Sequence, residues 1–72
     1  MPKNQAVSFN AFVRMLEDNG YSELRVKGGH YTFGNDKGNR ITVNYNLNKM
    51  VARRIVRENN LEPGSLKGFL RL

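Results

Sequence analysis

The chain has 72 residues, the length of one small domain, which leaves little room to enclose a deep pocket. It contains no cysteine, which excludes disulfides and thiolate metal sites, and no apolar run approaches the roughly 18 residues that cross a bilayer. Twelve Lys and Arg against six Asp and Glu give a net charge of +6, which favours nucleic acid, an acidic protein or an anionic surface as partner.

The first predicted element is a helix over residues 8–19. Ser8 suits its N-cap, and Gly20 lies where a left-handed residue would end it. Apolar residues recur between them at i, i+3, i+4 and i+7, as one face of a helix requires: Phe9, Phe12, Val13 and Leu16.

Three strands with a period of two follow this helix. Apolar and polar residues alternate from about Tyr21 to Lys27, then between and after two turns, Gly28-Gly29 and residues 35–39. We therefore predict a three-stranded antiparallel meander. The residues expected to face the helices are Leu24, Val26, Tyr31, Phe33, Ile41, Val43 and Tyr45.

A second helix is predicted over residues 48–59, with Asn60 suited to the position after its end and Pro63-Gly64 stopping any continuation. The extension over residues 62–72 carries apolar residues at helical spacing. It is open to three interpretations: a short docking helix, a partner-binding segment, including a contact between copies of the chain, or a frayed tail.

The predicted fold class is α+β with the order α-β-β-β-α, in which both helices cover one face of the sheet. Residues 1–72 form a single domain with a core over about 8–61. Residues 1–5 lack the apolar stretch of a secretory signal, so we expect a cytoplasmic protein.

The uncovered face of the sheet should gather the polar residues of the alternation. It has no carboxylate except Glu23 at its edge, and it suits a phosphodiester backbone. It carries no aromatic residue, which argues against base stacking, and a merely solvated face is the alternative. The candidate RNA-binding residues are Arg25, Lys27, Thr32, Arg40, Thr42 and Asn44, with Gly28 and Gly29 in the turn. A second basic run on the second helix is open to the same two interpretations: Lys49, Arg53, Arg54 and Arg57.

His30, the only histidine, is the candidate catalytic residue on this face. RNA cleavage without a metal needs a base for the 2′-hydroxyl, an acid for the 5′-oxygen and a cation for the developing charge. An imidazole has both protonation states near neutral pH and can serve in either proton transfer. With one histidine and no cysteine, neither a metal nor another cofactor is expected. The alternative is an ordinary surface histidine beside a hairpin turn.

The stretch from Leu16 to Tyr21, LEDNGY, and the stretch from Arg25 to Phe33, RVKGGHYTF, resemble the HicA family of bacterial toxins. The resemblance covers roughly residues 8–61. It implies a fold like that of double-stranded-RNA-binding domains and a metal-independent endoribonuclease that cleaves messenger RNA with one histidine, here His30. It also implies a HicB-like antitoxin as partner, in a type II toxin–antitoxin system. Gly29 stands where the family usually has serine.

Three functions remain open on the sequence. The first is the toxin-type endoribonuclease acting on single-stranded RNA, and the second is a non-catalytic module that binds RNA through the same face. The third is a basic interaction protein for an acidic partner. Membrane binding is disfavoured because the first helix carries Glu17 and Asp18, and the second uses its apolar stripe in the core.

Overall fold

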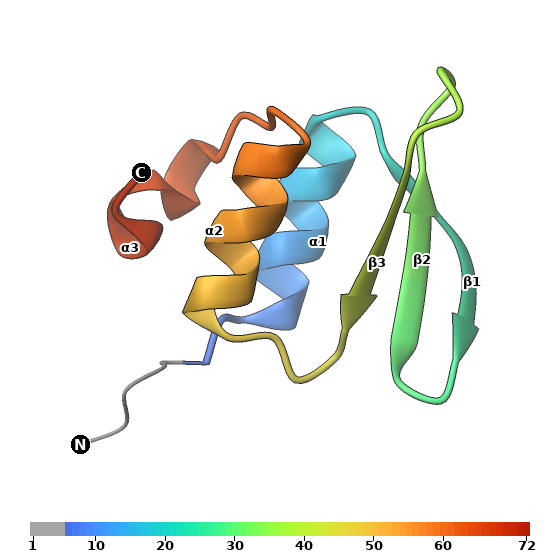
Figure 1. The fold of residues 1–72 in the computed structure, drawn as a ribbon, viewed down its shortest axis with the longest axis horizontal. Helices are drawn as coiled ribbons and strands as arrows, with labels where there is room; N and C mark the ends of the chain where they lie inside the picture. The colour runs from blue at the N-terminus through green and yellow to red at the C-terminus, as the bar shows by residue number, and fades with distance from the viewer. Residues whose placement is uncertain (1–5) are drawn as a thin grey trace.

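The computed structural model describes residues 6–72 and has the α+β order that the sequence predicts (Figure 1). Residues 1–5, from which we expected no secretory signal, lie outside the described residues. The elements are α1 (Phe9–Asp18), β1 (Ser22–Lys27), β2 (His30–Gly34), β3 (Arg40–Asn44), α2 (Lys49–Glu58), a 3₁₀ turn η1 (Gly64–Leu66) and α3 (Lys67–Leu70).

The molecule has a sheet layer and a helix layer. The antiparallel sheet has the strand order β1-β2-β3; α1 and α2 lie on one side of it, and α3 lies beyond them (Figure 1). Among residues 6–72, no helix is long and apolar enough to cross a membrane. The sheet contributes Phe33, Ile41 and Val43 to the core, and α1 and α2 contribute Phe12, Met15, Leu16, Ala52, Ile55 and Val56.

Both long helices begin at side-chain caps. Ser8 Oγ accepts the N–H of Ala11 at 3.2 Å, and Asn48 Oδ1 accepts the N–H of Val51 at 2.9 Å. Each bond satisfies one of the free N–H groups that open a helix. The backbone N–H of Val7 also donates to Leu47 at 3.0 Å, so the segments that lead into the two helices are joined.

Both helices also end in the same way. Gly20 and Asn60 have φ of +86° and +53°, the left-handed conformation that stops a helix. The residues that follow them, Tyr21 and Leu61, fold back into the core and donate their N–H groups to the last turn of the helix. This confirms the predicted ends of both helices.

The extension over residues 62–72 contains a short docked helix, α3, preceded by η1, which agrees with the first of its three interpretations. Leu70 is fully buried and Leu66 is nearly so, and both belong to the one core. The end of α1 holds the start of the extension, because the Asn19 side chain donates to the Glu62 carbonyl at 2.9 Å and accepts the Glu62 N–H at 2.8 Å. Contact between copies through this extension stays a prediction, and of its apolar residues Phe69 is the one left exposed.

Strand β1 contains a bulge that the sequence analysis did not predict. Glu23 pairs with Phe33 and Arg25 pairs with the next residue, Thr32, so Leu24 has no partner on β2. The extra residue shifts the alternation by one position for the part of the strand before it. Glu23 therefore lies on the helix side with Phe33, and the prediction that it borders the polar face is wrong.

Three residues that were predicted to be covered by the helices are exposed. Leu24 is 50% exposed because the bulge turns it to the other face, where its Cδ1 would lie 2.7 Å from a Cβ built on Gly34. Val26 is 46% exposed because every residue of β1 lies outside the cover of the helices. Tyr45 is 56% exposed because it follows the end of β3. These three predictions are wrong about burial.

Candidate functional site

We call the sheet face that points away from the helices the open face. Cross-strand pairing arranges its residues in three rows: Lys27–His30–Asn44, then Arg25–Thr32–Thr42, then Ser22–Gly34–Arg40 with Leu24 beside it. Neighbours within a row are about 5 Å apart and successive rows about 7 Å apart, the spacings of paired strands. The strand residues on this face include three cations and no carboxylate.

The rows show which predicted site residues lie close to the histidine. Lys27 and Asn44 flank His30 on the two neighbouring strands. Arg25 is one row away, and Arg40 is two rows away, at about 14 Å. The cations therefore form a line across the face rather than a cluster around the histidine.

The His30 side chain is exposed, and its ring contacts Asn44. Asn44 Nδ2 lies 3.5 Å from His30 Nε2, at the outer limit of a hydrogen bond. The amide orientation follows from its other end, where Asn44 Oδ1 accepts the N–H of Asn46 at 2.9 Å. Because the Asn44 NH₂ can only donate, Nε2 acts as the acceptor in this contact, a role that it has in the neutral ring with its proton on Nδ1. His30 thus exposes its ring on the open face, with Nε2 beside Asn44.

The hairpin turn beside His30 leaves space for a ligand. Gly28 and Gly29 have φ of +54° and +82°, as a tight two-residue hairpin requires. A Cβ built on either glycine would have no atom within 4 Å, apart from its own chain neighbours. A serine at position 29, as in HicA toxins, would have to adopt a left-handed backbone that costs about 1–2 kcal/mol.

An aromatic cluster that the sequence analysis missed lies at the same end of the sheet. The rings of Phe9, Tyr31 and Tyr45 are mutual neighbours, with centroid distances of 4.5, 5.0 and 6.3 Å. The Tyr45 N–H donates to the Gly29 carbonyl at 2.8 Å, which places Tyr45 directly beyond the row of His30. Alternation with Ile41 and Val43 predicts the side of the sheet on which the Tyr45 ring lies. It does not show that the helix layer ends before it covers this ring.

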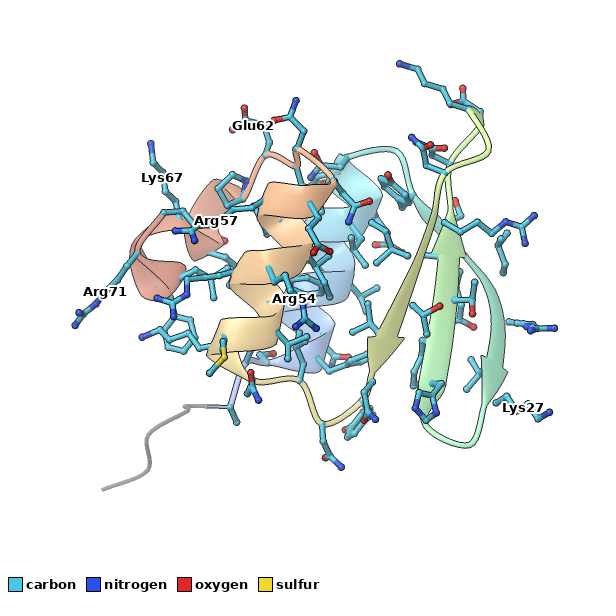
Figure 2. All side chains as sticks on the ribbon, viewed as in Figure 1. Lys27, Arg54, Arg57, Glu62, Lys67 and Arg71 are labelled. Carbon is cyan, nitrogen blue, oxygen red and sulfur yellow. The ribbon has the colours of Figure 1, made fainter. Side chains whose placement is uncertain are left out.

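A second basic surface lies on the helix side of the molecule. Figure 2 shows Arg54 and Arg57 on α2 and Lys67 and Arg71 around α3, whereas Lys27 extends from the far end of the sheet. Lys49 is engaged in packing, since its Nζ lies 4.7 Å above the centre of the Phe69 ring. Among residues 6–72, the open face and this helix-side surface are thus two separate groups of cations.

Two hollows in the surface lie away from the open face. The larger, about 430 Å³, is bordered by α1 and residues 62–65, and the smaller, about 260 Å³, lies where the ends of both helices meet the β2–β3 turn. No open-face residue lines either hollow. Among residues 6–72, no group of three or more His, Cys, Asp or Glu side chains could hold a metal ion.

No protein-family model, curated protein or solved structure matches this chain. The likeness to HicA toxins therefore depends on the residues quoted above and on the order of the elements.

Proposed function

We propose that the protein is the toxin of a type II toxin–antitoxin system, an endoribonuclease that cleaves messenger RNA on the open face without a metal. The observation that carries this proposal is the exposed His30 between Lys27 and Asn44, on a face with three cations and no carboxylate among its strand residues. Its Nε2 contacts only Asn44, at 3.5 Å, and a phosphodiester on this face can replace that contact.

In this reaction His30 Nε2 removes the proton of the RNA 2′-hydroxyl. The 2′-oxygen attacks the adjacent phosphorus and the bond to the 5′-oxygen breaks, which leaves a 2′,3′-cyclic phosphate and a 5′-hydroxyl. The leaving oxygen takes its proton from water or from the protonated ring, and Lys27 stabilises the charge that develops on the phosphorane. Proton transfer by a positioned histidine contributes about 10²–10⁴-fold to such a rate. The contact with Asn44, at 3.5 Å, is weak enough for the RNA to replace it.

The substrate and the resemblance together suggest the cellular setting. Messenger RNA as substrate implies action in the cytoplasm. By analogy with HicA toxins, a HicB-like antitoxin would bind the protein and cover the open face, and its carboxylates would meet Arg25, Lys27 and Arg40 there.

The test is cleavage of single-stranded RNA by purified protein in excess chelator. We expect wild type to cut and to leave cyclic phosphate ends, and His30→Ala, repurified in parallel, to leave the RNA intact. Arg54→Gln on α2 is the matched control and should cut like wild type. In bacteria, induced wild type should arrest growth and fragment messages while His30→Ala does neither. Cleavage that persists in His30→Ala would disprove the role of this residue.

A second candidate function is RNA binding without cleavage, and Gly29 is the observation that favours it. The family serine is missing beside the histidine, and with it a hydroxyl that could orient the imidazole or a phosphate. In that case wild type and His30→Ala would bind RNA equally, both would lose affinity steeply with salt, and neither would cut.

A further inference from the structure

The outermost ring of the aromatic cluster has an unusual degree of exposure. Tyr45 lies against Phe9 and Tyr31, at 5.0 and 6.3 Å between ring centroids, yet 56% of its surface is open to solvent. Phe9 and Tyr31 are half-buried and pack on the core, whereas Tyr45 adds little to it. A ring that served only to close the core would bury most of its area. Tyr45 is instead an aromatic surface with firm support on one side.

The position of this ring relates it to the histidine. Tyr45 follows Asn44, which pairs with His30, and its backbone is joined to Gly29, which precedes His30. The two side chains lie on opposite faces of the sheet at the same end. The path between them passes the hairpin turn, where the space over Gly28 and Gly29 is open. A strand whose phosphate lies at His30 can therefore turn around this end and place its neighbouring base on Tyr45.

We propose that Tyr45, supported by Phe9 and Tyr31, is a stacking site for one unpaired nucleobase next to the phosphate held at His30. This inference rests on the proposed function, because it assigns a ligand group to the RNA on the open face. The positive charge of the open face favours a polyanion such as RNA as the ligand. The aromatic ring beside that face favours the flat apolar part of this ligand, which is the base. The base must be free of its partner strand to reach Tyr45, so the site favours single-stranded RNA over duplex.

The test compares two uncleavable 2′-O-methyl strands of equal length, one with bases and one with abasic units. Their affinities are measured for wild type, Tyr45→Leu, Tyr45→Phe and Phe69→Leu. Phe69 is the control because it is an aromatic residue, 42% exposed, on α3 at the far side of the helices. One stacked base is worth about 1–3 kcal/mol, so Tyr45→Leu should weaken binding of the base-bearing strand roughly 5- to 150-fold. Binding of the abasic strand should not change, and Tyr45→Phe and Phe69→Leu should behave like wild type.

Fluorescence gives a second readout that does not depend on a loss of affinity. The chain has three tyrosines and no tryptophan, so its emission reports tyrosine alone. The base-bearing strand should quench part of this emission in wild type, and Tyr45→Phe should abolish the quenched part while it retains binding.

The outcomes separate this inference from the proposed function. If Tyr45→Leu binds the base-bearing strand as tightly as wild type, or weakens both strands equally, the stacking site is refuted while cleavage at His30 can still stand. If wild type binds neither strand, the proposed function and the stacking site fail together. A thermal melt of each variant excludes unfolding as the cause of a loss.

Discussion

Replacing Arg40 with glutamine should remove one phosphate contact, and the slope of log affinity against log salt should become less steep by the amount that one contact contributes. The three cations of the open face stand in rows about 7 Å apart, so an extended strand can place one phosphate on each. A single strand gives a slope of about −0.7 per phosphate in log affinity against log salt, hence about −2 for three contacts and about −1.4 for two. From about 50 to about 200 mM salt, affinity should fall about 18-fold for the parent and about sevenfold for the variant.

The assay is a salt titration of binding to a fluorescent single strand, in a His30→Ala background that cannot cut it. Arg54→Gln on α2 is the control, because Arg54 is exposed on the other basic surface (Figure 2). An unchanged slope in the Arg40→Gln protein would refute the argument that the rows track the phosphates. A slope reduced only by Arg54→Gln would move the RNA to the helix side.

Three further changes test other contacts. Leu70→Ala should lower the free energy of unfolding by about 3 kcal/mol, because Leu70 is fully buried between α3 and the core. In a thermal melt the Tm should fall by roughly 12–24 °C, and an unchanged Tm would mean that α3 is not docked. Gly29→Ala should cost about 1–2 kcal/mol in urea unfolding, because φ is +82° there, and Gly68→Ala is the control without positive φ. Asn44→Asp replaces the donor that faces His30 Nε2 by an acceptor. Imidazole ¹⁵N NMR should therefore show the proton of the neutral ring on Nδ1 in wild type and on Nε2 in the variant. The same tautomer in both proteins would contradict the contact at 3.5 Å.

Local signals in the sequence were sufficient to predict the helices and their ends. Ser8 and Asn48 are capping residues, and the pairs Asn19-Gly20 and Asn59-Asn60 each precede an apolar residue that folds back. These features need only the residues beside them, and so they can be found without knowledge of the tertiary structure. The extension could not be settled in this way, because its docking depends on a surface made by other parts of the chain.

Alternation predicted the cations, the histidine and the other polar residues of the open face, but not Leu24 on it, and the order of these residues required the register. The two-residue turn at Gly28-Gly29 makes Lys27 and His30 neighbours, and this contact could have been derived from the sequence. The position of Asn44 depends on the register across the longer turn over residues 35–39, which no residue type specifies. For the same reason alternation placed Arg40 and His30 on one face but could not show that two rows separate them.

The bulge in β1 decides the chemical character of the open face. In a regular strand Glu23, Arg25 and Lys27 would share one face, and a carboxylate would lie among the cations. The extra residue at Leu24 turns Glu23 to the helix side and puts an apolar side chain in its place, over Gly34, which has no side chain to obstruct it. A carboxylate at that position would repel the phosphate that Arg40 is proposed to bind. One unpaired residue in an edge strand therefore keeps the whole line from Arg40 to His30 free of negative charge. A strand with regular alternation would have left Glu23 on this face.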